Sequence, residues 1–112
     1  GGAKMTKGYR LAAKYVIHTV GPIWIDGESG EPELLASCYR SCLELAEANE
    51  IAIIAFPCIS TGSFGYPKGL ACDLAVTSVA EWLSRHSMPQ KATFCCFGRA
   101  DFELYQERLG AP

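Results

Sequence analysis

Residues 51–67 read IAIIAFPCISTGSFGYP, and this stretch decides the fold. Its first part, IAIIAF at 51–56, is entirely apolar and has the length of a buried strand. Pro57 and the glycine-rich segment behind it end that strand, and Pro67 suits the first turn of a helix, where its missing N–H costs no hydrogen bond. The stretch therefore predicts a strand that passes through a loop into a helix.

Further strands and helices are predicted on both sides of this unit. Residues 14–20, KYVIHTV, are β-branched and aromatic and stop at Gly21-Pro22, which is typical of a strand buried on both faces. A third apolar strand is expected over 93–97. Apolar residues at helical spacing predict helices over 32–49, over 67–86 and from an N-cap at Asp101 to about Leu109.

This alternation of strands and helices predicts an α/β fold with a parallel sheet and right-handed connections. In such sheets a ligand lies beyond the carboxyl ends of the strands, which here are residues 20–24, 58–67 and 97–101. Residues 4–10 are instead interpreted as a solvated basic patch.

Composition limits the class of protein. A chain of 112 residues, 49% of them hydrophobic, suits one folded domain. The formal net charge of −2 argues against nucleic acid as a partner. No apolar run could cross a bilayer and no export signal is found, so we expect no membrane partner and a cytoplasmic location.

The six cysteines are expected to be free and buried, because each lies within an apolar strand or helix pattern. They form no Cys-x-x-Cys motif, and with two histidines in the chain we expect neither a metal nor a cofactor. Cys58 and His18 could form a thiolate pair near the strand ends, but a structural cysteine and a structural histidine are the more common arrangement.

The loop over 58–67 carries the most chemical information. Gly62 and Gly65 allow close backbone approach, and the loop enters a helix whose free N–H groups can cradle a phosphate. The pattern fits neither a Walker loop nor a dinucleotide fingerprint. It is not a nucleophile elbow either, since Ser60 would need glycine where Cys58 stands.

Other side chains of this loop point to a nucleotide-like ligand. Ser60, Thr61 and Ser63 supply hydroxyls. The rings of Phe64 and Tyr66 are placed to cover a sugar or a base. The alternative is a simple helix entry in which both rings fill the core.

Three stretches form a distinctive pattern when they are taken together: TKGYRLAAKYVIHTVGPIW at 6–24, FPCISTGSFGYP at 56–67 and CCFGRADFELYQERL at 95–109. The pattern resembles the macro domain family, in particular its bacterial members similar to O-acetyl-ADP-ribose deacetylases, and extends over essentially the whole chain. The resemblance implies a three-layer α-β-α fold with a mixed, largely parallel sheet. Family members bind ADP-ribose, and many remove it from proteins or deacetylate its O-acetyl ester, so the implied partners are ADP-ribose, a derivative, or an ADP-ribosylated protein.

The resemblance also implies roles for single residues. The backbone of residues 60–65 would hold the diphosphate, Phe64 would pack on the distal ribose, and Pro57 and Ile59 would shape the floor of the loop. The implied ligand-binding residues are Ser60, Thr61, Gly62, Ser63, Phe64, Gly65 and Tyr66, with Phe97 on the adenine side.

At its amino-terminal side the chain departs from the family. Members begin with two strands and a helix, and carry there an Asn-Ala-Ala-Asn segment and a glycine-rich loop that supplies catalytic residues. Residues 1–4 resemble the point just after this region, so residues 1–112 are expected to form the carboxyl-terminal two-thirds of a macro domain. Its catalytic residues are left unidentified, because the family's candidates for the role are absent.

The family's second strand would lie between the strands at 15–20 and 51–56, so two strand edges would lose their partner. The edges could pair directly, a second copy could exchange segments through them, or the chain could be part of a longer product. Three functions follow: a hydrolase of O-acetyl-ADP-ribose or of protein-linked ADP-ribose, a non-catalytic ADP-ribose-binding module, or an inactive remnant.

Overall fold

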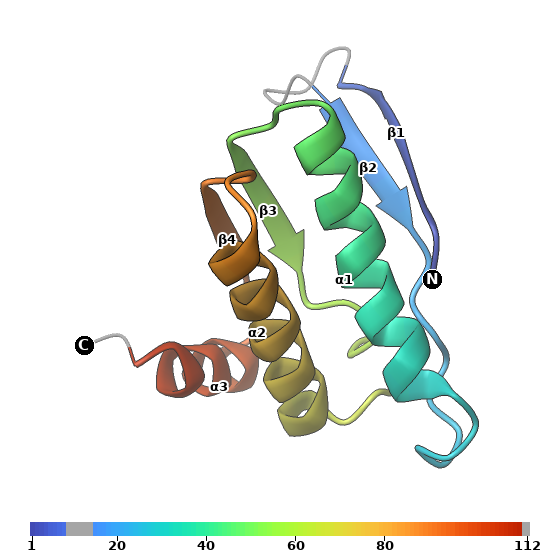
Figure 1. Ribbon diagram of the computed structural model, residues 1–112. Helices are drawn as coiled ribbons and strands as arrows, with labels where there is room; N and C mark the ends of the chain where they lie inside the picture. The colour runs from blue at the N-terminus through green and yellow to red at the C-terminus, as the bar shows by residue number, and fades with distance from the viewer. Residues whose placement is uncertain (9–14, 111–112) are drawn as a thin grey trace.

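The computed structural model describes residues 1–8 and 15–110. The elements follow one another as β1 (Ala3–Lys7), β2 (Tyr15–Thr19), α1 (Glu31–Ala48), β3 (Ile53–Pro57), α2 (Lys68–Arg85), β4 (Lys91–Cys95) and α3 (Arg99–Leu109) (Figure 1). The α/β class is confirmed, and the bounds of α1 and α2 differ from the predicted ones by one residue at each end. No helix in the described part of the chain is long and apolar enough to span a membrane.

The strands form two separate pairs. β1 and β2 are antiparallel, with Met5 opposite Ile17, whereas β3 and β4 are parallel, with Phe56 opposite Phe94. Lys4 and Lys7 are exposed, as the interpretation of residues 4–10 as a solvated basic patch expected, whereas Tyr9 and Arg10 lie outside the described residues. The sequence did not predict that Ala3–Lys7 form the strand β1. Lysines at both ends of a short strand are typical of a sheet edge, which is why the sequence concealed it.

β2 and β3 do not pair with each other, and in the view of Figure 1 α1 runs between them. The hypothesis of direct pairing is therefore wrong for the described residues. Burial on both faces is also wrong: Ile54 and Phe56 of β3 are buried, but Ile53 is 66% exposed, and Tyr15 of β2 is exposed as well. One face of each pair lacks a covering layer within residues 1–8 and 15–110.

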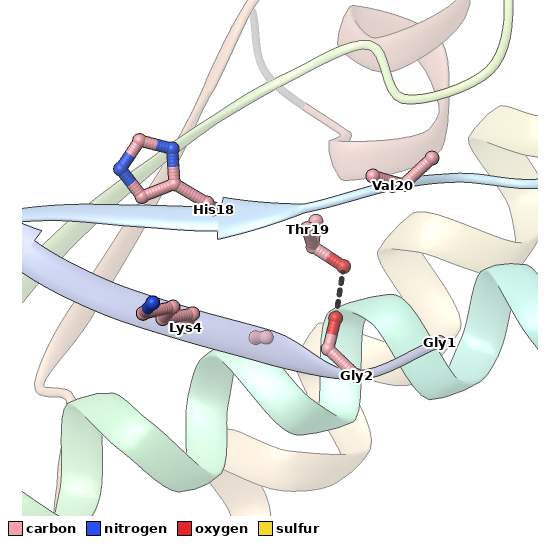
Figure 2. A pocket seen from close by; sticks show the side chains of 7 residues that line it. Gly1, Gly2, Lys4, His18, Thr19 and Val20 are labelled. Carbon is pink, nitrogen blue, oxygen red and sulfur yellow. Dashed lines mark hydrogen bonds between the residues drawn. The ribbon is translucent and has the colours of Figure 1, made fainter.

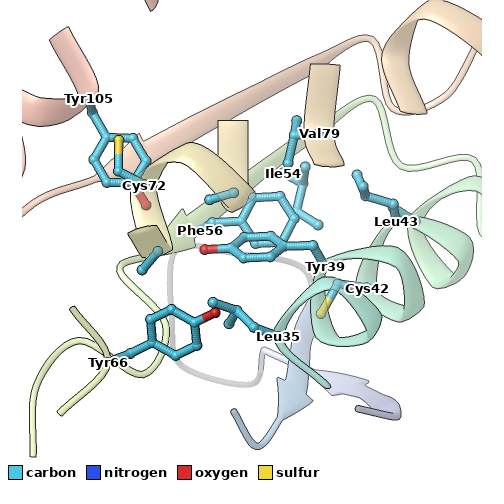
Figure 3. Packing of buried hydrophobic residues seen from close by; sticks show 13 residues of the cluster. Leu35, Tyr39, Cys42, Leu43, Ile54, Phe56, Tyr66, Cys72, Val79 and Tyr105 are labelled. Atoms are coloured by element: carbon cyan, nitrogen blue, oxygen red, sulfur yellow. The ribbon is translucent and has the colours of Figure 1, made fainter. Parts of the chain in front are cut away.

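A chain of aromatic rings joins β3 and β4 to the helices. The ring of Tyr39 in α1 packs edge to face on Phe56, with ring centroids 5.0 Å apart. The rings of Phe56 and Phe94 stack at a centroid distance of 6.1 Å, and those of Phe94 and Tyr105 of α3 lie 4.8 Å apart. Figure 3 shows the rings of Tyr39, Phe56 and Tyr105 with Leu35, Leu43 and Cys72 around them. Burial raises the pKa of the Tyr39 and Tyr105 hydroxyls, which stay protonated. This packing fixes the carboxyl ends of β3 and β4.

Two predictions near β4 need correction. The strand runs over Lys91–Cys95, two residues before its predicted position, because its register with β3 places Lys91 opposite Ile53. Asp101 does not cap α3: the helix begins at Arg99 after Gly98, and Asp101 lies in its first turn.

Candidate functional site

The loop between β3 and α2 is held by its own hydrogen bonds. The N–H of Tyr66 donates to the carbonyl of Ser60 at 2.9 Å, and the N–H of Gly65 donates to that of Gly62 at 3.0 Å. The hydroxyl of Thr61 donates to the carbonyl of Cys58 at 3.2 Å. The loop over 58–67 is thus a closed turn that leads directly into the helix α2.

Ser60 has an unusual backbone conformation. Its φ is +67°, a region that residues other than glycine rarely adopt, and its buried Oγ has no hydrogen-bond partner among the described residues. Gly65 also has a positive φ, of +74°, but glycine accepts it without strain. Strain of the kind seen at Ser60 persists only where the surrounding structure enforces it, and it clusters at functional sites.

The loop leaves a run of backbone N–H groups without protein acceptors. Within residues 1–8 and 15–110, no acceptor bonds the N–H groups from Ser60 to Phe64. They precede the N-terminus of α2, whose first turn contains no acidic side chain. Unpaired N–H groups beside a helix N-terminus attract anions.

A second segment, residues 20–24, packs against the loop. A Cβ on Gly21 would lie 2.2 Å from Ser60 Oγ and 2.6 Å from Ile59 Cγ2, so only glycine fits there. The N–H of Trp24 donates to the carbonyl of Phe64 at 2.8 Å. Sequence reasoning treated Gly21 only as the end of a strand, because a contact with a residue far along the chain leaves no local signal.

The two rings of the loop have different environments. Tyr66 is 3% exposed and packs on Trp24 with ring centroids 4.7 Å apart, and burial raises the pKa of its hydroxyl. Its ring therefore fills the core, as the simple helix-entry alternative expected. Phe64 is only half-buried.

Glu31, the first residue of α1, fixes the segment that follows Trp24. Its buried carboxylate accepts hydrogen bonds of 2.7–2.9 Å from the N–H groups of Ile25, Asp26, Gly27 and Ser29. Burial alone would raise the pKa of this group, but the backbone hydrogen bonds outweigh it and lower the pKa to about 2. Sequence analysis assigned no such role to Glu31, since the pattern shows only an acidic helix start.

Cys58 and His18 each interact with other residues, not with one another. Cys58 Sγ lies 3.8 Å from Cys96 Sγ and 3.8 Å from the carbonyl of Cys95, whereas His18 Nε2 lies 2.9 Å from Thr6 Oγ1. Burial raises the pKa of the Cys58 thiol to about 12, and the neighbouring Cys96 sulfur adds to the rise. A thiolate nucleophile at Cys58 is therefore disfavoured. All six cysteines are free, as expected. The prediction that all are buried is correct for Cys38, Cys42 and Cys72 and wrong for the other three, since Cys58 and Cys96 are half-buried and Cys95 is exposed.

Phe97 lies beyond β4 and is 99% exposed. It borders a hollow of about 350 Å³ at the start of α3 that also includes Phe102 and Arg99. Nearby, Lys68 Nζ of α2 contacts Asp101 Oδ2 at 3.3 Å, while the other carboxylate oxygen of the buried Asp101 has no partner within the described residues.

A second hollow of about 350 Å³ lies on β1 and β2 and is lined by no residue of the loop over 58–67. Residues 1–4 and 18–20 line it, and Thr19 Oγ1 donates to the carbonyl of Gly2 at 2.7 Å (Figure 2). No group of three metal-ligating side chains occurs in the described part of the chain.

Residues 1–75 match the family model for the Macro domain. The chain belongs to the macro domain family. This macro domain is 53% identical over 111 residues to the macro domain-containing protein CT2219 of Chlorobaculum tepidum, a match that covers 99% of the chain and 64% of the relative. It is 47% identical over 110 residues to the O-acetyl-ADP-ribose deacetylase of Cronobacter sakazakii, with 98% and 61% covered.

Solved structures give the same family. The Oceanobacillus iheyensis macrodomain with ADP superposes with a TM-score of 0.92 at 37% identity, over 97% of this chain and 57% of that one. The Trypanosoma brucei macrodomain in complex with ADP-ribose superposes with a TM-score of 0.87 at 38% identity, over 96% of this chain and 45% of that one. The macro fold expected from the sequence is thereby confirmed. This macro domain spans 64%, 63% and 58% of the first three curated relatives.

Proposed function

We propose that this macro domain binds ADP-ribose and that the backbone of residues 60–65 holds the diphosphate. The observation that carries the proposal is the run of unpaired N–H groups from Ser60 to Phe64 in a strained turn before α2. A diphosphate supplies the anionic oxygens that such a run attracts. Relatives named for ADP-ribose chemistry, and neighbours solved with ADP and ADP-ribose, support the choice of ligand.

Side chains around the loop complete the proposed site. The exposed part of Phe64 packs on the distal ribose, and the hydroxyls of Thr61 and Ser63 lie beside the anion. Tyr66 contributes indirectly, because its buried ring packs on Trp24 and supports the loop. Phe97, fully exposed at the end of β4, is assigned to the adenine.

The activity of the whole protein is part of the same proposal. A protein that contains this macro domain would hydrolyse O-acetyl-ADP-ribose or ADP-ribose attached to protein, as the names of relatives suggest. The alternative is a non-catalytic ADP-ribose-binding module or an inactive macro domain fragment. Six free thiols accord with a cytoplasmic location.

Calorimetric titration with ADP-ribose tests the binding proposal. Gly62 is exposed, and a Cβ there would meet no atom within 4 Å, so Gly62→Val leaves the fold intact and intrudes only on a bound ligand. We expect saturable heat from the parent chain and none from Gly62→Val. The matched control is Gly2→Val, which is also free of contacts within 4 Å. Equal affinity of Gly62→Val and the parent would contradict the role of the loop.

A parallel assay with O-acetyl-ADP-ribose separates an enzyme from a binding module. Release of acetate supports the hydrolase, and binding without release supports the module. Absence of both binding and release supports the inactive fragment.

A further inference from the structure

Two free thiols meet at the base of the ligand loop. Cys58 begins the loop after β3, and Cys96 follows β4. Their Sγ atoms lie 3.8 Å apart. Pro57 pairs with Cys95 in the parallel register, so the next residue of each strand stands beside its counterpart. Neighbouring strands are about 4.8 Å apart, within the Cα separation of about 4.4–6.8 Å that a disulfide spans.

We propose that Cys58 and Cys96 form a reversible disulfide and that this bond weakens ligand binding by the loop over 58–67. The disulfide is inferred from the geometry of the two sulfurs alone. Its effect on binding rests on the proposed function, since it concerns the affinity for ADP-ribose.

The other four cysteines lack this arrangement. Cys38, Cys42 and Cys72 are buried, and Cys95 is exposed on the opposite side of β4 from Cys96, since side chains alternate along a strand. Cys58 and Cys96 are both half-buried, so a small oxidant reaches them while they stay in contact. The pairing is therefore specific to positions 58 and 96.

A hydroperoxide supplies the oxidising equivalents. The Cys96 sulfur attacks one peroxide oxygen, the O–O bond breaks, and Cys96 becomes a sulfenic acid with release of water. The Cys58 sulfur then attacks the Cys96 sulfur, the S–O bond breaks, and the hydroxyl leaves as water with the proton of Cys58. In sum, two thiols and one hydrogen peroxide give one disulfide and two waters.

The order of the two steps follows from the environment of Cys58. Burial raises the pKa of the Cys58 thiol to about 12, and the neighbouring Cys96 sulfur adds to the rise, so the attack on the free peroxide is assigned to Cys96. Cys58 then reacts only with the sulfur that lies beside it, 3.8 Å away, where proximity offsets its weak ionisation.

The disulfide would disturb the loop because close contacts hold the loop in place. Shortening the sulfur separation from 3.8 Å to about 2.05 Å draws Cys58 toward β4. The carbonyl of Cys58 holds the Thr61 hydroxyl, and Ser60 is already strained and pressed against Gly21. A displaced Cys58 therefore misaligns the N–H groups that follow it.

The disulfide is tested by treating the purified protein with hydrogen peroxide, blocking free thiols with N-ethylmaleimide, and mapping peptides by mass spectrometry. We expect a cross-link between the peptides of Cys58 and Cys96, formed equally in Cys95→Ser and lost in Cys96→Ser. Full alkylation of all cysteines, sulfinic acid at Cys96 without a cross-link, or a cross-link that uses Cys95 would overturn the proposal.

The effect on the loop is tested by titrating ADP-ribose into the reduced, oxidised and re-reduced protein. We expect oxidation to weaken binding about tenfold or more, as displacement of positioning groups does, and dithiothreitol to restore it. Cys96→Ser should keep its affinity after peroxide. Equal affinity of the oxidised and reduced forms would overturn the regulatory half. If the reduced protein does not bind ADP-ribose, the proposed function is wrong and the regulatory half falls with it, while peptide mapping alone decides the disulfide.

Discussion

The two strand pairs of this macro domain differ in how firmly they are packed. In β3, Ile54 and Phe56 are buried beneath the helices, and the aromatic contacts extend from α1 to α3. In β1 and β2 the described side chains are exposed or only half-buried. The candidate ligand loop leaves the firmly packed pair. A well-packed base allows the strained turn at Ser60 to persist. The loosely packed pair reaches the loop only through the segment that follows β2, where Gly21 lies against Ser60 and Trp24 packs on Tyr66.

The largest effect is expected from breaking the packed pair at its centre. Phe56→Ala removes a ring that contacts both Tyr39 and Phe94, and the resulting cavity should lower the free energy of unfolding by about 3–5 kcal/mol. Ile17→Ala on half-buried β2 should cost only about 1 kcal/mol. Urea unfolding of both variants measures the difference, and equal losses would show that the two pairs are packed alike.

A smaller loss of stability is expected from a substitution at the contact between the segment that follows β2 and the loop that follows β3. Gly21→Ala places a methyl group 2.2 Å from Ser60 Oγ and should lower the free energy of unfolding by about 1–3 kcal/mol, as overpacking does. Ser60→Gly removes that oxygen, so the double variant should recover part of the loss. A double-mutant cycle with urea checks this. Strictly additive effects of the two single substitutions would place the clash elsewhere.

Acid should loosen the segment behind Gly21. The pKa of Glu31 falls from 4.5 to about 2 on folding, so its stabilising contribution is complete above pH 4.5 and is lost as the pH drops toward 2. Glu31→Gln should lower the melting temperature at pH 7 and remove this part of the acid sensitivity. Glu33→Gln, exposed in the same helical turn, is the control. An unchanged acid profile in Glu31→Gln would contradict the role of the carboxylate.

The smallest expected effect concerns the strain itself. Ser60→Gly relieves a positive φ and removes a buried hydroxyl without a described partner, so it should raise the free energy of unfolding by about 0.5–1 kcal/mol. Ser63→Gly, at an exposed position, should lack this gain. Urea midpoints of the two variants decide the matter, and a loss of stability in Ser60→Gly would mean that the hydroxyl has a stabilising partner.

The sequence predicted the parts of the fold that follow from local patterns. The helix bounds came from apolar spacing and proline, and the loop over 58–67 came from its glycines. β1 was missed because its lysines conceal an edge strand, and β4 was displaced because its position depends on the register with β3. The positive φ of Ser60 and the need for glycine at position 21 arise from contacts between distant segments, and no local pattern records them.

The most direct test of the loop's role is an NMR titration of the isotopically labelled chain with ADP-ribose. If the loop backbone holds the diphosphate, the amide signals from Ser60 to Phe64 should shift most and move downfield as their N–H groups gain an anionic acceptor. Unchanged signals from these amides in a chain that binds ADP-ribose elsewhere would contradict the assignment of the site.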